Sequence, residues 1–337
     1  MKKKKGVLLV NLGTPDSTKT SDVRKYLREF LMDKRVVDIP SFPRWLLVNG
    51  IIAPFRAPKS ANEYRKLFDE RGSPLKYYTE DITHLLQKKL NEDYIVKFAM
   101  RYQSPSLKSV LEEFKERVAS IHVIPLFPQY ASATSGSVID KVMEITKKWQ
   151  IIPDIKFTSQ FLEEELFIDT VVDQGRKLLE VGDYEHFIFS YHGLPERQIR
   201  KASYRNYCQL GKCCGFLNEQ NRFCYRAQCF ETTRLVVEKL EIKKEDYTVC
   251  FQSRLGRDPW VKPYTEDVLK ELADKGVKKV LAFSPAFVSD CLETTIEVGQ
   301  EYQENFLEEG GEKWDLVPSL NNEDKWVECL KTLVSNN

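Results

Sequence analysis

Short apolar runs rich in β-branched residues alternate along this chain with segments in which apolar residues recur at helical spacing. The apolar runs span residues 6–12, 94–100, 120–126, 186–191, 248–252 and 277–284. Helical spacing marks residues 21–31, 75–90, 107–118, 162–179, 232–240 and 266–273. The alternation predicts parallel sheets of an α/β fold, covered by helices on both faces. In such folds, functional sites gather at the carboxyl ends of the strands.

The same pattern divides the chain into two lobes. A chain of 337 residues has the length of two domains of about 150 residues each. The alternation of strand-like and helical segments is interrupted at residues 151–154, Ile-Ile-Pro-Asp, which we take as the boundary region. We therefore expect one lobe over residues 1–155, a second over residues 156–320, and a C-terminal helix within residues 321–337.

Residues 36–55 depart from the alternation. This stretch is apolar and aromatic, yet it contains three prolines and does not follow one helical period throughout. One interpretation is an irregular connection packed against the core. The other is the lip of an apolar pocket that admits a flat hydrophobic ligand and touches a membrane surface.

Composition and charge narrow the classes of protein to consider. The formal net charge of +1 favours neither nucleic acid nor an anionic membrane as a partner. No signal segment and no run of 18 apolar residues is found, so we expect a cytoplasmic protein. In that compartment the eight cysteines are expected to be thiols or metal ligands and not disulfides.

Reactive side chains follow two of the apolar runs, at the points where these predicted strands end. His192 follows the strand-like run 186–191 and precedes a Gly-Leu-Pro turn. The second run leads to Asp290, Cys291 and Glu293, and helical spacing then stacks Glu293, Glu297 and Glu301 on one face. A column of carboxylates suits the passage of a divalent cation. The alternatives are a histidine satisfied in the core and an ordinary acidic helix face.

Five motifs taken together resemble the ferrochelatase family. Residues 190–195 (Ser-Tyr-His-Gly-Leu-Pro) are similar to the signature around its catalytic histidine, and residues 251–265 to its Gln-Ser…Trp…Pro-x-Thr stretch. Residues 289–294 (Ser-Asp-Cys-Leu-Glu-Thr) match a third element, and residues 10–15 and 125–130 supply the N-terminal half. The motifs run in order from residue 7 to about residue 301.

The resemblance implies a chelatase-like architecture and a site. It implies two Rossmann-like lobes, each a parallel sheet flanked by helices, with the active-site cleft between them. His192 and Glu293 correspond to the catalytic pair that faces the porphyrin centre, and Glu297 and Glu301 fall on the family's acidic line. These four are the implied metal ligands. The division of proton acceptance and metal ligation between His192 and Glu293 stays open, as does the face of the ring that receives iron.

The resemblance also implies a porphyrin pocket. A porphyrin is an apolar disc with two carboxylates at its edge, so its pocket needs apolar walls and a few anion donors. Leu12 stands where family members acting on protoporphyrin carry an apolar residue. The implied porphyrin contacts are Leu12, Arg56, Tyr64, Ser73, Arg101, Tyr102 and Trp260. Cys291 occupies a place where relatives often carry histidine, and we expect it to fill space more than to bind iron.

Five of the eight cysteines crowd into residues 207–229. They are Cys208, Cys213, Cys214, Cys224 and Cys229. Many members of the family hold a 2Fe–2S cluster, and such a cluster needs four thiolates. We expect its ligands to be Cys208, Cys224 and Cys229 with one of Cys213 or Cys214. A structural Zn²⁺ and unmetallated thiols are the alternatives.

The expected activity is therefore insertion of Fe²⁺ into protoporphyrin IX, with release of two protons, as the terminal step of haem synthesis. A cobalt chelatase for a carboxylate-rich tetrapyrrole is disfavoured, because residues 36–55 are apolar. A non-catalytic porphyrin or haem carrier has no use for the acidic column. The expected partners are protoporphyrin IX and Fe²⁺, a membrane touched through residues 36–55, and transiently the preceding enzyme of the haem pathway.

Overall fold

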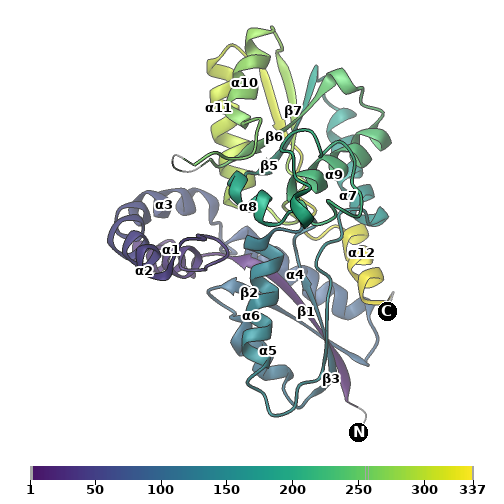
Figure 1. Ribbon diagram of the computed structural model, residues 1–337. Helices are drawn as coiled ribbons and strands as arrows, with labels where there is room; N and C mark the ends of the chain where they lie inside the picture. The colour runs from purple at the N-terminus through teal and green to yellow at the C-terminus, as the bar shows by residue number, and fades with distance from the viewer. Residues whose placement is uncertain (1–2, 255, 257, 336–337) are drawn as a thin grey trace. The chain divides into compact units, whose positions relative to one another are not determined.

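A computed structural model describes residues 3–254, 256 and 258–335, and within them the chain forms two compact units. Unit 1 comprises Met1–Phe127, Ala131–Gln160 and Val327–Asn337, and unit 2 comprises Pro128–Tyr130 and Phe161–Trp326. Each unit contains one four-stranded sheet in which every neighbouring pair is parallel. The predicted α/β class with two parallel sheets is confirmed (Figure 1).

The sheet of unit 1 has the strand order β2-β1-β3-β4. Its central strand carries a run of fully buried side chains from Val7 to Val10, because both faces are covered. The strands are β1 (Lys4–Gly13), β2 (Tyr94–Tyr102), β3 (Val118–Pro125) and β4 (Asp154–Phe157). The helices are α1 (Thr20–Leu31), α2 (Ser41–Leu46), α3 (Ala53–Leu67), α4 (Pro74–Lys89), α5 (Leu107–Phe114) and α6 (Ser137–Thr146), with π-helical turns η1 (Leu47–Ile52) and η2 (Ser132–Gly136).

The sheet of unit 2 has the strand order β6-β5-β7-β8. The strands are β5 (His186–His192), β6 (Tyr247–Gln252), β7 (Lys279–Phe283) and β8 (Lys313–Leu316). The helices are α7 (Glu165–Leu179), α8 (Glu196–Lys201), α9 (Tyr225–Leu240), α10 (Thr265–Asp274) and α11 (Tyr302–Glu308). A π-helix, η5 (Leu292–Glu301), precedes α11, and 3₁₀ turns form η3 (Tyr204–Asn206) and η4 (Lys244–Asp246).

The observed division of the chain differs from the expected one at three places. The predicted boundary at residue 155 falls inside β4, which pairs with β3 and so belongs to unit 1. Residues 128–130 group with unit 2, because Gln129 Nε2 donates to Thr232 Oγ1 at 2.9 Å. The C-terminal helix α12 (Asp324–Ser335) is not separate: its first residues belong to unit 2 and the rest to unit 1.

The pattern of apolar runs missed two strands, β4 and β8. Each has four residues and lies at the edge of its sheet. Residues of β4 alternate between exposed and half-buried, so its sequence carries no continuous apolar run. The other two edge strands, β2 and β6, are longer and carry apolar runs, so short length and partial exposure, and not edge position alone, explain the two omissions.

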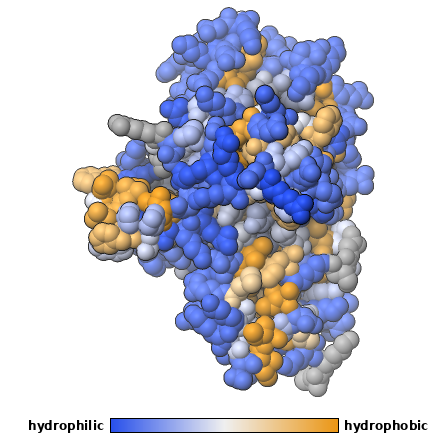
Figure 2. Space-filling view, viewed as in Figure 1, coloured by the Kyte–Doolittle hydropathy of each residue, from blue (hydrophilic) through white to orange (hydrophobic). Residues whose placement is uncertain are grey.

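The segment 36–55 forms an exposed helical arm instead of a core connection. We call the stretch from α2 through η1 to Phe55, residues 41–55, the apolar arm. Phe42 is 72% and Phe55 79% exposed, and Figure 2 shows hydrophobic residues gathered over α2 and α3. The interpretation as a core-packed connection is therefore wrong. No helix in the described residues has the length and apolar composition needed to cross a bilayer.

Candidate active site

His192 is the last residue of β5, at the carboxyl end of the sheet in unit 2. Its ring lies 6.4 Å, centroid to centroid, from the ring of Trp260. The next residue, Gly193, donates its N–H to the main-chain oxygen of Gln252 at 2.9 Å. A Cβ at Gly193 would lie 2.8 Å from that oxygen and 3.2 Å from the Trp260 ring, so only glycine permits this close turn.

The hydrogen bond of the His192 ring defines its tautomer. Nδ1 lies 2.7 Å from the main-chain oxygen of Gly193. A carbonyl oxygen can only accept, so Nδ1 carries the hydrogen and the neutral ring keeps its lone pair on Nε2. The Tyr225 hydroxyl donates to the main-chain oxygen of His192 at 2.9 Å, which further fixes the strand end. Nε2 of His192 is therefore a pre-oriented proton acceptor or metal ligand.

Gln252 links His192 to the acidic segment. It is the register partner of His192 across β5 and β6 and is itself buried. Its Oε1 accepts a hydrogen bond from Ser190 Oγ at 2.7 Å, which leaves Nε2 as the donor end. That Nε2 lies 3.1 Å from the main-chain oxygen of Glu293 and 3.2 Å from Oε2 of Glu297. One amide thus connects the two strand ends with η5.

Three side chains donate hydrogen bonds to the Glu297 carboxylate of the acidic column. Besides Gln252, the Ser253 hydroxyl lies 2.7 Å from Oε2 and 2.9 Å from Oε1, and the Tyr302 hydroxyl lies 3.1 Å from Oε1. Burial, together with the charge of Glu297 and its hydrogen bond, raises the pKa of Tyr302, so this hydroxyl stays protonated and can donate. Three neutral donors therefore fix the orientation of one negative charge.

The acidic segment is a π-helix and not the α-helix that its spacing predicted. Residues 292–301 form η5, and the N–H of Tyr302 donates to the main-chain oxygen of Glu297, five residues earlier. A wider turn rotates successive side chains less than an α-helix does, so the three glutamates do not stack as expected. The helix begins at Cys291, whose N–H donates to Thr294 Oγ1 at 2.9 Å.

Cys291 is buried, and its thiol receives the Thr294 N–H as part of this cap. Burial raises its pKa well above the ordinary value, with the charge of Glu293 adding to the effect, so it is a neutral thiol. Glu293 is half-buried and Glu301 is exposed. Within the described residues, no group of three or more His, Cys, Asp and Glu side chains is placed to hold a metal ion. The four-residue metal set stays a prediction.

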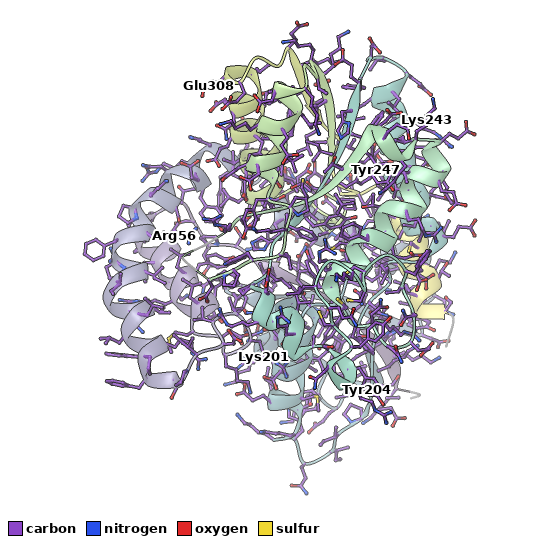
Figure 3. All side chains as sticks on the ribbon, turned by 45° about the horizontal axis from the view of Figure 1, so that its top comes forward. Arg56, Lys201, Tyr204, Lys243, Tyr247 and Glu308 are labelled. Atoms are coloured by element: carbon purple, nitrogen blue, oxygen red, sulfur yellow. The ribbon has the colours of Figure 1, made fainter. Side chains whose placement is uncertain are left out.

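Three of the expected porphyrin contacts lie on α3 and at the start of α4 in unit 1. Arg56 is exposed on α3 (Figure 3), and Tyr64 is buried on the same helix against Tyr26. Ser73 immediately precedes α4, is buried, and makes no cap hydrogen bond. Its Oγ has no hydrogen-bond partner among the described residues. A buried hydroxyl without a partner is costly, and a ligand oxygen would satisfy it.

Arg101 and Tyr102 are engaged within unit 1. Asp33 Oδ2 accepts from Arg101 at 2.5 Å, from the Tyr102 hydroxyl at 2.9 Å and from Ser137 Oγ at 2.5 Å. Burial acts against the ionised form of Asp33, but the hydrogen bond from Ser137 and the charge of Arg101 leave its pKa below the ordinary value. The Arg101–Asp33 pair is thus a buried ion pair at the end of β2.

Leu12 is half-buried at the end of β1, beside the end of β2. The next residue, Gly13, has φ +113° and pairs with Tyr102, whose main-chain oxygen would lie 2.1 Å from an added Cβ. Only glycine fits there, so this close strand contact requires Gly13. It fixes Leu12 at the carboxyl edge of the unit 1 sheet.

Four cysteines of the loop before α9 lie close enough to affect one another's ionisation. The Sγ atoms of Cys213 and Cys214 are 4.0 Å apart. A hydrogen bond from Cys224 lowers the pKa of Cys214 to about 5 against the effect of burial, with help from Arg226. The charges of Cys208 and Cys214 contribute to raising the pKa of both Cys213 and Cys224. All eight cysteines stand as free thiols in the structure.

Cys229 differs from these four. It lies on α9, fully buried, and burial raises its pKa well above the ordinary value. Cys250 is likewise fully buried on β6, and burial raises its pKa to about 12, as expected of a core thiol. The cysteine sulfurs of the loop are of the kind that bind an iron–sulfur cluster or a metal ion. Among the described residues, however, they are not already arranged around a position for an ion.

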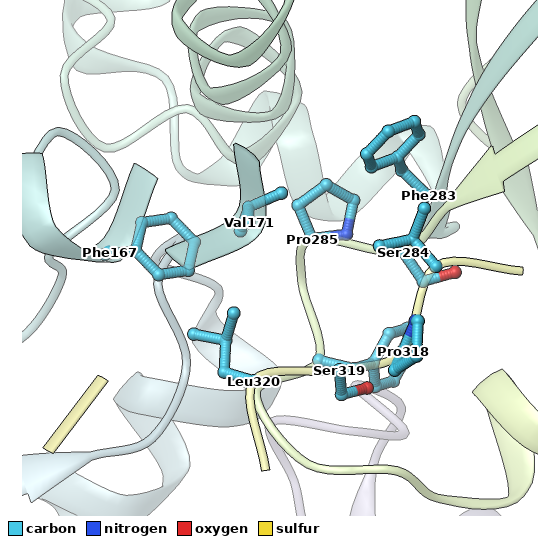
Figure 4. A pocket seen from close by; sticks show the side chains of 10 residues that line it. Phe167, Val171, Phe283, Ser284, Pro285, Pro318, Ser319 and Leu320 are labelled. Carbon is cyan, nitrogen blue, oxygen red and sulfur yellow. The ribbon is translucent and has the colours of Figure 1, made fainter. Parts of the chain in front are cut away.

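A small cavity of about 20 Å³ lies in unit 2 beside the end of β7. Figure 4 shows that Phe167 and Val171 of α7, Ser284 and Pro285 after β7, and Leu320 point into it. A space of this size holds about one water molecule. It is far too small for a tetrapyrrole and does not include His192.

The sequence analysis did not single out Gln252, Ser253, Tyr302 or Asp33 as site residues. Gln252 and Ser253 stand at the carboxyl end of an expected strand, so the strand-end rule that selected His192 could have selected them too. Tyr302 and Asp33 follow no local pattern. Asp33 depends on a contact with Arg101, which is distant in the sequence, and Tyr302 reaches Glu297, five residues earlier, across the turn from η5 into α11.

Two solved structures resemble this fold at low sequence identity. SirB from Bacillus subtilis with Fe³⁺ matches with a TM-score of 0.54 at 10% identity, covering 98% of this chain and 94% of that one. The sirohydrochlorin chelatase SirB from Bacillus subtilis subspecies spizizenii in complex with cobalt matches with a TM-score of 0.51, at 10% identity over 97% and 92% of the two chains. At this identity the likeness concerns the fold alone.

Similarity in sequence is much closer to proteins named ferrochelatase. One from Legionella pneumophila (strain Lens) is 41% identical over 332 residues, covering 98% of this chain and 99% of that protein. One from Coxiella burnetii (strain Dugway) is 41% identical, covering 96% of this chain and 91% of that protein. One from Bdellovibrio bacteriovorus is 40% identical, covering 99% of this chain and 99% of that protein. The ferrochelatase family model matches residues 4–337. This chain, with its strand-end histidine and its anchored glutamate, therefore belongs to the ferrochelatase family.

Proposed function

We propose that this chain is a lyase that inserts Fe²⁺ into protoporphyrin IX, using His192 as the proton acceptor and Glu293 and Glu297 as the acidic groups beside it. The observation that carries the proposal is the chain of contacts from His192 through its register partner Gln252 to Glu297. It brings a pre-oriented imidazole and a fixed carboxylate to the carboxyl edge of one sheet, in a member of this family.

Metallation requires two pyrrole N–H bonds to break while four nitrogen lone pairs turn toward the metal. The two protons must leave the ring as Fe²⁺ enters, so the overall charge is conserved. His192 Nε2 can take a proton because Nδ1 is committed to Gly193. Glu293 is half-buried, close to this edge, and its main-chain oxygen accepts from Gln252, so it suits contact with the cation or with the second proton.

Unit 1 supplies groups for the propionates in this proposal. Arg56 offers a guanidinium that forms strong charge-assisted bonds with carboxylates. The buried Ser73 hydroxyl, which has no hydrogen-bond partner among the described residues, supports a role in ligand binding. Arg101 is already paired with Asp33, so its proposed part is to shape the pocket and not to bind a propionate directly.

Anaerobic mixing of protein, protoporphyrin IX and Fe²⁺ tests the activity. An enzyme converts the free-base spectrum to that of haem over many turnovers. A carrier would bind the porphyrin without metallating it, and a cobalt chelatase would prefer Co²⁺ and a carboxylate-rich tetrapyrrole. Absence of turnover with Fe²⁺ and protoporphyrin IX would overturn the proposal.

We further propose that Cys208, Cys213, Cys214 and Cys224 ligate a 2Fe–2S cluster, with Cys229 kept as a core thiol. The gathering of these four cysteines in one loop, with the Sγ atoms of Cys213 and Cys214 4.0 Å apart, supports ligation there. Of the four, the pKa of Cys214 is lowered, while burial and neighbouring thiols raise the pKa of Cys213 and Cys224. The complete burial of Cys229 on α9 argues against its earlier inclusion in the set. Such a cluster would supply one-electron redox chemistry, or structural support of the loop, when bound.

The cluster is tested by the visible spectrum and by the iron, sulfide and zinc content of protein purified without oxygen. Replacing any of the four loop cysteines by Ser should abolish the visible absorption. Cys229→Ser and Cys250→Ser serve as matched controls and should keep it. A colourless protein with one bound zinc would establish the rival zinc site, and a metal-free protein would show that the thiols are unmetallated.

We also propose that the apolar arm contacts the membrane surface at its periphery. Five large apolar side chains of the arm are exposed: Phe42, Trp45, Leu46, Ile51 and Phe55. An exposed apolar patch of this kind suits the interface of a bilayer or an apolar partner. Replacing Trp45 and Phe55 by Ser should reduce vesicle binding if the arm inserts. Cytoplasmic location and contact with the preceding pathway enzyme stay predictions.

A further inference from the structure

The loop of unit 2 that carries the cysteines has a fixed shape. Asn221 Nδ2 donates to the main-chain oxygens of Cys213 and Phe216 at 2.9 and 2.8 Å. Ser203 Oγ accepts from the N–H of Cys208 at 2.8 Å, and Asn218 Nδ2 donates to the Tyr207 hydroxyl at 3.3 Å. Polar contacts, and not packing of aromatic rings, therefore hold this loop together.

The aromatic side chains of the loop are turned outward. Phe216 is 79%, Tyr204 57% and Phe223 49% exposed. Burying one phenylalanine side chain is worth about 1.5–3 kcal/mol, so the fold gains little from these rings where they stand. Phe223 lies edge to face with Tyr130, at 5.4 Å between ring centroids. Exposed rings on a fixed loop are available to a partner outside the protein.

Cations accompany these rings. Residues 200–222 contain one acidic side chain, Glu219, although the whole chain has almost as many acids as bases. Five exposed cations share the segment: Arg200, Lys201, Arg205, Lys212 and Arg222. Figure 2 shows a hydrophilic surface around α8, and Lys201 and Tyr204 are labelled in Figure 3. We call residues 200–223 the basic aromatic loop.

We propose that the basic aromatic loop binds the surface of a bilayer that contains anionic phospholipids. Lysine and arginine pair with lipid phosphates, while phenylalanine and tyrosine rings sit at the level of the headgroups. This combination of side chains is what an anionic lipid surface requires. An acidic folded protein is the other class of partner, but the loop offers no long helix or sheet edge to match one. The proposal does not depend on the cluster or on the apolar arm.

Vesicle flotation with the full-length wild-type protein tests the proposal. One set of vesicles contains phosphatidylcholine alone, and the other contains equal parts of phosphatidylcholine and phosphatidylglycerol. We expect binding to the anionic vesicles to be much the stronger and to weaken as salt is raised. Each cation near an anionic surface is worth about a fivefold change in partition, so Lys212→Gln with Arg222→Gln should lower it about thirtyfold. Phe216→Ser should lower it about tenfold.

Matched controls separate the loop from the rest of unit 2. Lys243→Gln with Lys275→Gln removes two exposed cations elsewhere, and Val181→Ser removes an exposed apolar side chain elsewhere. These variants should bind anionic vesicles as the wild type does. Chelatase activity in detergent should stay unchanged in all of them, which verifies folding.

Three outcomes would overturn the proposal. Equal binding to both kinds of vesicle would show that the anionic lipid is not recognised. Full binding by the loop variants, together with its loss on Trp45→Ser in the apolar arm, would assign membrane contact to the arm alone. Failure to float with either kind of vesicle would show that the loop does not bind lipid and would favour an acidic protein as its partner.

Discussion

His192 and Gln252 are register partners at the carboxyl ends of β5 and β6, and the Gln252 side chain reaches from there to Glu297. Main-chain pairing of β5 with β6 thus fixes the position of His192 relative to Gln252, whose side-chain amide orients the carboxylate of Glu297. Ser190 determines which end of the amide donates, because its hydroxyl occupies Gln252 Oε1. The imidazole proposed as proton acceptor is therefore positioned by a strand end, and the proposed acidic group by a side chain of the neighbouring strand.

Replacing His192 by Ala should abolish most of the metallation activity. Loss of a general base lowers a rate by about a hundredfold or more, whereas porphyrin binding relies mainly on apolar contacts. Anaerobic turnover and quenching of porphyrin fluorescence measure the two separately. His84→Ala, which changes an exposed histidine on α4, is the control and should leave both unchanged. Near-wild-type turnover by His192→Ala would contradict the assigned role.

Tyr302→Phe and Ser253→Ala each remove one donor to Glu297 without changing its charge. A hydrogen bond to a charged group contributes about 1.5–3 kcal/mol, so we expect kcat to fall by about tenfold or more. KM for the porphyrin should stay constant, because neither residue is proposed to contact the ring. Tyr247→Phe removes a tyrosine hydroxyl that only Lys244 contacts at the surface, and it serves as the control. An increase in KM alone would assign these residues to binding instead.

Asp33→Asn should destabilise unit 1 strongly. The substitution leaves the Arg101 guanidinium buried without its counter-charge, and breaking a buried ion pair costs about 3–5 kcal/mol. Urea unfolding of the full chain measures the loss. Asp183→Asn, in an exposed pair with Lys279, is the matched control and should produce no measurable change. Equal midpoints for both variants would show that the Arg101–Asp33 pair has little energetic weight.

His122 should make stability depend on pH below neutrality. Burial lowers its pKa from 6.5 to about 4, with Lys156 adding to the effect. Between these two values the unfolded chain binds a proton that the folded chain does not, so stability is present above pH 6.5 and is lost as the pH falls toward 4. Because His122 is partly exposed, we expect a loss of about 1–3 kcal/mol.

Urea midpoints across this pH range test the prediction for His122. His122→Gln keeps a hydrogen-bonding group for Thr158 Oγ1 but cannot titrate, so its midpoint should change less with pH. His84→Gln, which changes an exposed histidine on α4, is the matched substitution for comparison. Parallel curves for wild type and His122→Gln would exclude the predicted contribution.

Sequence pattern was sufficient for the elements whose local composition is decisive. The six longer strands, β1 to β3 and β5 to β7, carry apolar runs that the pattern can recognise, and all six were found. Edge strands β4 and β8 were missed, because half-exposed strands of four residues have no such composition. The pattern also placed His192 at a strand end, where the fold has it.

What the sequence alone determined is the α/β alternation, the strand-end histidine and the family motifs, because each depends on residues that are neighbours along the chain. Tertiary structure decided that residues 292–301 adopt a π-helix, that Glu297 is held by Gln252, Ser253 and Tyr302, and that Arg101 is paired with Asp33. The contacts of Glu297 with Gln252 and Ser253, and of Arg101 with Asp33, join side chains far apart in sequence, and their geometry arises only when the strands pair and the helices pack. No rule based on local residue spacing predicts these contacts.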